Sequence, residues 1–317
     1  MRVPGTLEGV RVDRAVAMVT GMSRAAAAEL VAAGRVRVDG VAVASRSAPL
    51  VEGSDLSFDV PAPADPLPTA DPAIEVVVVH EDEELVVVDK PAGLVVHPGA
   101  GHEHDTLVSG LLARFPELAE VGDPMRPGIV HRLDRGTSGL LVVARTAAAH
   151  RSLAAQLAAH TAGRRYLALV SGHVEEDRGE VDAPIGRSAR TPTRMAVAEH
   201  GRPARTTYWV LGRYDLPVAC TFLAVSLATG RTHQIRVHLS AIGHPVVGDD
   251  RYGGGAVPGL DRLFLHAAAL SLDHPRTGER CTWSSPLPEE LTTLVGGGAR
   301  LPPLPPGDPL PAANPPG

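Results

Sequence analysis

The sequence predicts an α+β protein in which a small α+β module precedes a larger domain with a central mixed, largely antiparallel sheet. Three observations lead to this prediction. Two proline-rich stretches interrupt the chain, and helices and central strands do not tolerate prolines at that density. A helix–helix–hairpin pattern precedes the first stretch. Behind it, apolar strands follow one another without regular helices between them, which disfavours a doubly wound parallel sheet.

These breaks divide the chain into four expected parts. A small domain occupies 9–60, a proline-rich linker 61–74, a larger domain 75–297, and a proline-rich disordered tail 298–317. The tail could alternatively be a polyproline ligand for another protein.

Composition excludes several classes of protein. With 44% hydrophobic residues, a chain of 317 residues can form a core, which excludes wholesale disorder. No apolar run approaches the roughly 18 residues of a membrane span, and the charged first residues predict no signal peptide. Two cysteines, Cys220 and Cys281, are too few for a disulfide scaffold, so we expect a cytoplasmic protein. The net charge of −6 argues only weakly against a nucleic-acid partner, because a binding groove needs only local basicity.

The small domain begins with two short helices. Apolar residues at helical spacing predict the first helix: Val12, Ala15, Val16 and Val19. Ser23 can cap a second helix from Arg24 to about Ala33, which Gly34 ends. Alternating apolar residues on both sides of Asp39-Gly40 then predict a two-residue hairpin.

The larger domain reads mainly as strands. The expected strands are 76–80, 85–89, 140–145, 166–170 and 220–227. Thr146 can cap a helix that runs to about His160, and Thr232 can cap a helix from His233 to about Ala241. Apolar residues predict which side of that second helix is buried: Ile235, Leu239 and Ile242.

The densest polar cluster surrounds Asp134, in the segment 128–139. One carboxylate stands there among several arginines, and this positive environment favours its ionised form. Such a carboxylate is a usable nucleophile or charge stabiliser. A carboxylate that only caps a turn, through the amides of Thr137 or Ser138, is an equally good interpretation of the spacing.

Three further segments are basic, and each has a purely structural alternative. Residues 230–239 could be an amphipathic helix with a basic solvent face, and residues 164–172 could be a buried strand with a core tyrosine. Residues 187–205 carry five arginines and one acid, which suits either a phosphate-tracking surface or a solvated loop. Lys90, the only lysine, is not preceded by the spaced glycines of a phosphate-binding loop.

At this point the motifs resemble those of a known family, the RluA/RluD-type RNA pseudouridine synthases. HRLDRGTSGL at 131–140 is similar to the family signature, and the resemblance continues through 85–98, 165–172, 184–204, 230–239 and 243–267 in the family's order. The module at 9–60 resembles an S4 RNA-binding domain, on Val12-Asp13-Arg14, Ser23-Arg24 and 34–40.

The resemblance implies isomerisation of uridine to pseudouridine in RNA, without cofactor or metal. Asp134 matches the catalytic aspartate, which attacks either the ribose C1′ or the uracil C6. Tyr166 matches the pocket tyrosine that stacks on the uracil, and Arg236 matches the arginine paired with the aspartate. Arg132 matches a position suited to fill the gap left by a flipped base.

The same resemblance predicts the remaining RNA contacts and the partners. We expect further contacts from His131, Thr137, Arg14, Arg24, Arg35, Arg187, Arg194, Arg231, His233 and Gln234. The expected partner of this cytoplasmic monomer is structured RNA, with 23S ribosomal RNA favoured by the S4-like module. Two alternatives remain: an RNA-binding assembly factor with an idle catalytic body, and a hydrolase that uses Asp134 as general base.

Overall fold

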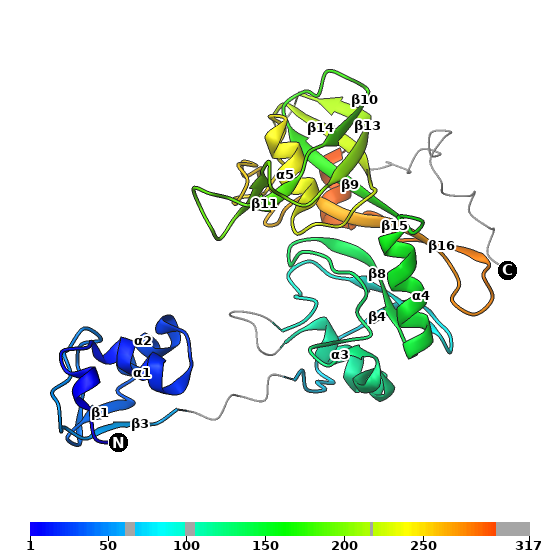
Figure 1. The fold of residues 1–317 in the computed structure, drawn as a ribbon. Helices are drawn as coiled ribbons and strands as arrows, with labels where there is room; N and C mark the ends of the chain where they lie inside the picture. The colour runs from blue at the N-terminus through cyan, green and yellow to red at the C-terminus, as the bar shows by residue number, and fades with distance from the viewer. Residues whose placement is uncertain (61–66, 99–104, 216–217, 296–317) are drawn as a thin grey trace. The chain divides into compact units, whose positions relative to one another are not determined.

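The computed structural model describes residues 1–60, 67–98, 105–215 and 218–295. The chain divides into two compact units, Met1–Pro66 and Leu67–Gly317 (Figure 1). The predicted tail at 298–317 lies outside the described residues, as does the part of the predicted linker at 61–66, while residues 67–76 contain neither helix nor strand. Within the described residues, no helix is both long enough and apolar enough to cross a membrane.

The N-terminal unit buries two helices against a small antiparallel sheet. Its elements are η1 (Gly5–Leu7), α1 (Val12–Thr20), α2 (Arg24–Ala32), β1 (Val36–Val38), β2 (Val41–Ala42) and β3 (Leu56–Phe58), in the sheet order β2-β1-β3. Ser23 caps α2 by accepting the N–H of Ala26, as predicted. Asp39 and Gly40 both have positive φ, which is the two-residue turn expected from Asp-Gly. Val19 lies in the predicted helix but is exposed, because the core reaches only the first two turns of α1.

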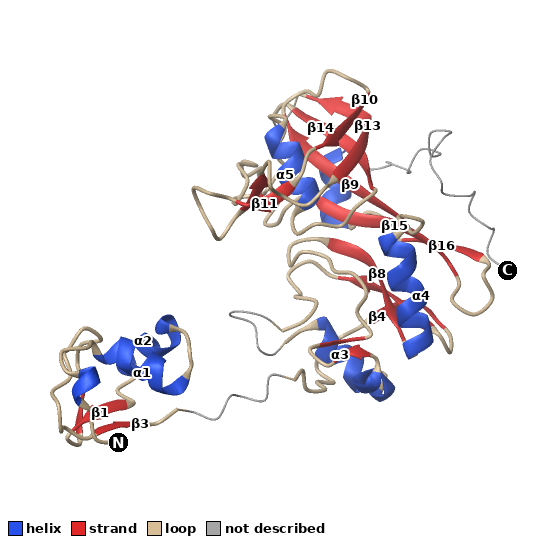
Figure 2. Ribbon diagram, viewed as in Figure 1, coloured by secondary structure: helices blue, strands red, loops and turns tan. Residues whose placement is uncertain are grey.

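A nine-stranded sheet organises the second unit (Figure 2). Its order is β10-β13-β14-β9-β15-β8-β5-β4, with β16 also paired to β15, and β15–β8 is the only parallel pair in the described sheet. The predicted mixed, largely antiparallel α+β fold is therefore confirmed. The strands are β4 (Val77–Glu81), β5 (Leu85–Lys90), β8 (Ser138–Ala144), β9 (Gly163–Ser171), β10 (Arg178–Asp182), β13 (Arg205–Tyr214), β14 (Cys220–Leu227), β15 (Leu265–Asp273) and β16 (Arg280–Ser284).

Helices cover both faces of the sheet. Alternate residues of β5 and β8 point to opposite faces: Val86 and Leu141 join the core that contains α3 and α5, whereas Val87 and Val142 join the core that contains α4. The remaining elements are α3 (Leu107–Arg114), η2 (Pro116–Glu120), β6 (Gly122–Asp123), β7 (Arg126–Pro127), α4 (Ala147–Ala158), β11 (Ile185–Arg187), β12 (Met195–Val197), α5 (Gln234–Ala241), α6 (Glu289–Thr292) and η3 (Thr293–Val295).

The start of β8 is fixed by a close backbone approach. Gly139 has φ +110° and faces Ala267 of β15, and a Cβ added there would lie 2.3 Å from the Ala267 carbonyl oxygen. Only glycine fits this position. The neighbouring Ser138 hydroxyl is hydrogen-bonded to Nδ1 of His266 at 2.9 Å. These contacts anchor the end of the loop that carries Asp134.

Candidate active site

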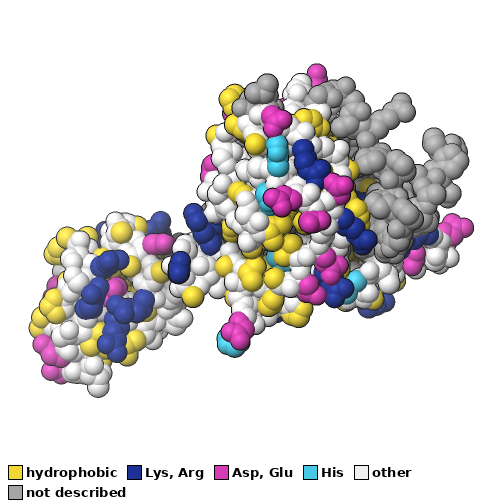
Figure 3. Space-filling view, turned by 90° about the horizontal axis from the view of Figure 1, so that it is seen from above, with side chains coloured by type: hydrophobic (Ala, Val, Ile, Leu, Met, Phe, Trp, Pro, Cys, Tyr) yellow, Lys and Arg dark blue, Asp and Glu magenta, His cyan; other side chains and the backbone are white. Residues whose placement is uncertain are grey.

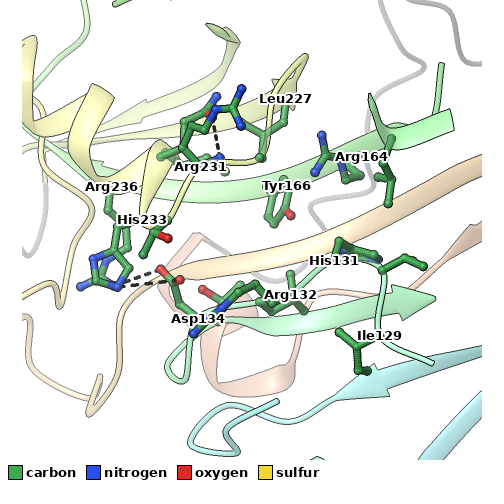
Figure 4. Close-up of a pocket in the computed structure, with 18 of the residues that line it drawn as sticks. Ile129, His131, Arg132, Asp134, Arg164, Tyr166, Leu227, Arg231, His233 and Arg236 are labelled. Atoms are coloured by element: carbon green, nitrogen blue, oxygen red, sulfur yellow. Dashed lines mark hydrogen bonds and ion pairs between the residues drawn. The ribbon is translucent and has the colours of Figure 1, made fainter. Parts of the chain in front are cut away.

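A pocket of about 530 Å³ opens on the sheet face that α5 covers (Figure 4). Segments that are distant in the sequence meet in its wall, chiefly the loop before β8, the strand β9, and the turn that leads from β14 into α5, with the C-terminal end of α4 beside them. The three residues assigned to catalysis by resemblance all lie in its wall: Asp134, Tyr166 and Arg236.

The Asp134 carboxylate binds an arginine rather than the turn that follows it. The backbone carbonyl of Asp134 accepts the N–H of Thr137 at 3.0 Å, so the main chain alone closes the turn. The side chain accepts a hydrogen bond from Nη1 of Arg236 at 3.0 Å. It is 17% exposed, so the carboxylate faces the pocket. The turn-capping interpretation of this aspartate is therefore wrong.

Arg236 is held by a second carboxylate. Its Nε donates to Oδ2 of Asp249 at 2.6 Å and its Nη2 donates to Oδ1 at 2.8 Å, which leaves Nη1 for Asp134. The Tyr252 ring lies 4.9 Å from the guanidinium carbon. Burial alone would lower the pKa of Arg236, but the bonds to Asp249 and the two carboxylate charges raise it above its ordinary value. The guanidinium is thus a fixed positive charge beside Asp134.

The turn before α5 brings His233 to the same carboxylate. The predicted cap at Thr232 was wrong: the N-cap is His233, in the left-handed conformation with φ 57° and without a side-chain cap. A left-handed backbone is costly for a residue with a Cβ and is common at functional sites. His233 Nδ1 is hydrogen-bonded to the Tyr252 hydroxyl at 2.7 Å, and its Nε2 lies 3.9 Å from Asp134.

Tyr166 projects from β9 into the pocket beside these charges (Figure 4). It is only 6% exposed. Burial raises its pKa, the charge of Arg164 opposes that shift, and the Asp134 carboxylate adds to it. The phenol is therefore protonated at neutral pH and presents a neutral aromatic face beside an ionic pair.

A buried lysine connects two loops behind the site. Lys90 is fully buried, and its Nζ donates to the carbonyls of Pro91 and Leu94 at 2.8 Å and of Arg135 at 3.3 Å. Gly93 N–H also donates to the Arg135 carbonyl. The loop that carries Asp134 is thus tied to the loop after β5, a role that the sequence analysis did not assign to Lys90.

The predicted RNA contacts fall into three groups, of which the third, Arg14, Arg24 and Arg35, lies on the N-terminal unit. Six of them line the pocket with Asp134: His131, Arg132, Thr137, Arg231, His233 and Gln234. Arg187 and Arg194 are exposed on the β11–β12 hairpin and do not line it. Arg132 is exposed, and its nearest polar partner is Nε2 of His97 at 3.5 Å.

The helix α5 does not have the basic solvent face that one interpretation of 230–239 gave it. Arg236 and His238 are buried, whereas Ile242, predicted to face the core, is 38% exposed. Gln234 is buried as well, and its amide makes four hydrogen bonds inside the protein, to Thr229, Arg231 N–H, the Arg205 carbonyl and Thr206. That is its full capacity, so Gln234 holds the turn and has no bond left for RNA.

Arginines gather on the N-terminal unit (Figure 3). A depression of about 410 Å³ is lined by Arg11, Arg24 and Arg46 around the buried Asp13. Arg24 lies 3.5 Å from the Asp13 carboxylate. Arg14 and Arg35 are exposed but are not among the residues that line the depression. Three guanidiniums around one buried carboxylate leave an excess of positive charge on this surface.

His131 makes the stability of the protein depend on pH. Its burial, followed by the charge of Arg164, lowers its pKa from 6.5 to about 3. Between these values the unfolded chain binds a proton that the folded chain does not, so the free energy of unfolding falls as the pH falls. The expected loss from this residue is at most about 1.4 kcal/mol per pH unit.

Urea unfolding at pH 7.5 and pH 5 measures this loss. His131→Asn should reduce the difference in unfolding free energy between the two pH values. His200→Asn, at an exposed position, should leave it unchanged. An equal pH dependence in wild type and His131→Asn would show that another group causes it.

Several residues of the site were missed by sequence reasoning. Asp249 and Lys90 lie in segments that resemble the family, 243–267 and 85–98, but only the fold brings them to Arg236 and to the loop that carries Asp134. Arg164 could have been found: it precedes Tyr166 by two positions on a strand and therefore points to the same face.

Comparisons with known proteins show which family this chain resembles. Residues 84–241 match the RNA pseudouridylate synthase family. Ribosomal large subunit pseudouridine synthase D of Nitrosomonas europaea is 51% identical over 238 residues, 73% of this chain and 67% of that protein. The protein of the same name from Pseudomonas aeruginosa is 44% identical over 307 residues, 92% of this chain and 93% of that protein.

A solved structure has the same fold. Human RNA pseudouridylate synthase domain containing 1 matches with a TM-score of 0.53 at 32% identity, over 67% of this chain and 84% of that one. With curated relatives this similar over most of its length, the chain belongs to the RluA/RluD-type RNA pseudouridine synthases, isomerases that act on RNA, as the sequence resemblance predicted.

Proposed function

We propose that this enzyme converts specific uridines of large-subunit ribosomal RNA to pseudouridine, with Asp134 as the nucleophile on a uridine turned out of its helix. One observation carries the proposal. The Asp134 carboxylate faces a pocket and is 3.0 Å from Arg236, whose charge is itself fixed by Asp249. A carboxylate hydrogen-bonded to a permanent cation is positioned to attack and has its charge balanced before the substrate arrives.

The proposed reaction needs no oxidant or reductant. The bond between N1 and the ribose C1′ breaks, the uracil turns, and C5 joins C1′. C5 loses a proton and N1 gains one, so substrate and product are isomers. Attack on C1′ or on C6 starts from the same Asp134 carboxylate, and the proposal covers both routes.

Tyr166 suits the turning of the base. A protonated, buried phenol offers a flat apolar face on which a neutral uracil stacks in any orientation. A polar wall would instead hold one orientation through hydrogen bonds. We assign the stacking surface to Tyr166 for this reason.

Arg132 suits the space that the uridine leaves. Extruding a base from paired RNA costs roughly a few kcal/mol, and a planar group that occupies the stack offsets part of it. Arg132 is exposed at the pocket beside Asp134 and has no carboxylate partner among the described residues. Its guanidinium is therefore available to enter the helix.

The substrate class rests on the relatives. Two proteins named as large-subunit synthases share 51% and 44% of aligned residues with this chain. A ribosomal RNA substrate and two free cysteines fit a cytoplasmic enzyme.

Tritium release tests the proposal. The reaction replaces the hydrogen on C5 with the bond to C1′. Transcripts labelled with tritium at uridine C5 should therefore release one tritium to water for each uridine that is converted. Large-subunit transcripts should release it, and small-subunit transcripts should not. No release from any large-subunit transcript would refute the assigned substrate.

The N-terminal unit fits a second RNA-binding surface of the S4 type. Its arginines surround the depression at Asp13, and a tethered second site raises the affinity for RNA. Deletion of residues 1–60 is expected to weaken RNA binding and flatten its salt dependence, while the rate at saturating RNA changes less. Filter binding between 50 and 200 mM salt, beside single-turnover rates, separates the two effects. Unchanged affinity and salt slope would contradict the assignment.

A further inference from the structure

Arg164 is a buried cation whose charge is not matched by a neighbouring acid. It is 7% exposed, lies in the wall of the active-site pocket and forms no ion pair or hydrogen bond with any described residue. Its Nε is buried without an acceptor. Burying an unpaired guanidinium costs several kcal/mol, so such a group marks a position where an anion binds.

A second unpartnered donor lies near Arg164. Nε2 of His131 accepts the N–H of Val142 at 3.1 Å, so the neutral ring carries its proton on Nδ1. That nitrogen is buried and has no acceptor. In the view of Figure 4, Arg164 and His131 lie on one side of Tyr166 and Asp134 lies on the other.

The backbone of a neighbouring turn packs closely against the Arg164 guanidinium. Gly230, in the turn between β14 and α5, approaches the guanidinium so nearly that an added Cβ would lie 2.5 Å from Nη1 of Arg164. By contrast, Asp134 and Arg236 at the other end of the pocket already pair with each other, and Arg236 also binds Asp249.

From these observations we propose that Arg164, with the Nδ1–H of His131, binds a backbone phosphate that flanks the target uridine. This proposal rests on the proposed function and adds a subsite to it. RNA supplies one negative charge per nucleotide, and a guanidinium binds a phosphate through two parallel hydrogen bonds. A uracil carbonyl is neutral and would leave the buried charge unmatched. The phosphate thus fixes the nucleotide at one end of the pocket while its glycosidic bond reaches Asp134 at the other.

Kinetics of Arg164→Gln form the first test. A charged hydrogen bond to a phosphate contributes about 1.5–3 kcal/mol, so KM for a large-subunit transcript should rise about 10-fold or more, with a smaller change in kcat. Arg164→Lys keeps the positive charge but lacks the planar guanidinium that makes two parallel hydrogen bonds, so its KM should lie between those of Arg164→Gln and wild type. Arg276→Gln, at an exposed arginine paired with Glu83 outside the pocket, should match wild type.

The second test reads the phosphate directly and needs no turnover. The probe is a single-stranded heptanucleotide with one central uridine, in which either flanking phosphate is replaced by an uncharged methylphosphonate. One replacement should weaken binding by wild type about 10-fold or more and have little effect on Arg164→Gln. The salt slope of log Kd should fall by about 0.7 in that variant.

Three results would overturn the subsite. These are a folded Arg164→Gln with unchanged KM and salt slope, a wild type indifferent to both methylphosphonates, and equal methylphosphonate losses in wild type and variant. The last result would assign Arg164 to the base instead. If no transcript releases tritium but the heptanucleotide behaves as expected, the substrate assignment fails and the phosphate subsite stands.

Discussion

Asp134→Asn should abolish pseudouridine formation, with a rate loss of about 10⁴-fold or more, while RNA binding stays within a few-fold of wild type. The amide has nearly the same shape and can still accept the hydrogen bond from Arg236, so the pocket should keep its form. It has no negative charge and cannot act as the nucleophile. Losses of this size are typical when a covalent catalyst is removed.

Single-turnover tritium release measures this rate, and filter binding measures affinity. Asp261→Asn, at an exposed aspartate outside the pocket, is the matched control and should behave as wild type. Pseudouridine formation by Asp134→Asn at a rate within 10-fold of wild type would refute its role as nucleophile.

Asp249→Ala should damage both stability and catalysis. The change removes both hydrogen bonds that fix Arg236 and leaves a buried guanidinium with Asp134 as its only carboxylate partner. Breaking a buried pair from one side costs about 3–5 kcal/mol of unfolding free energy. We also expect kcat to fall by about 100-fold or more, because a misplaced Arg236 no longer orients Asp134.

The neighbouring residue provides the control. Asp250 is exposed, so Asp250→Ala should change the unfolding free energy by less than about 0.5 kcal/mol and leave kcat unchanged. Urea unfolding and kcat are measured on the same preparations. Asp249→Asn, which keeps one acceptor, should lie between Asp249→Ala and wild type. If Asp249→Ala kept the kcat of wild type, Asp249 would have no positioning role.

Local signals predicted the local parts of the fold. The strand expected at 220–227 is β14 without any shift in its ends, and the Asp39-Gly40 turn forms the expected hairpin. Ser23 and Thr146 cap the helices assigned to them. For the caps and the hairpin turn the determining interactions lie within a few residues, so the sequence window contains them. The strand is marked by its own apolar run, although its pairing partner β9 is distant in the sequence.

The features that the sequence did not predict depend on contacts between residues that are distant in the chain. The turn before α5 was predicted wrongly because Gln234 anchors it to residues of β13 and the preceding turn, and His233 rather than Thr232 becomes the cap. Spacing alone could not separate a turn-capping Asp134 from a catalytic one, since its partner Arg236 is 102 residues away. Asp249 and Lys90 enter the site through the same long-range packing.

Pseudouridine mapping of ribosomal RNA at single-nucleotide resolution tests the central claim most directly. Cells that lack this protein would be compared with the same cells expressing wild type or Asp134→Asn. We predict that specific pseudouridines disappear from large-subunit RNA and return only with the wild-type protein. A large-subunit pattern identical in all three strains, or restoration by Asp134→Asn, would contradict the account.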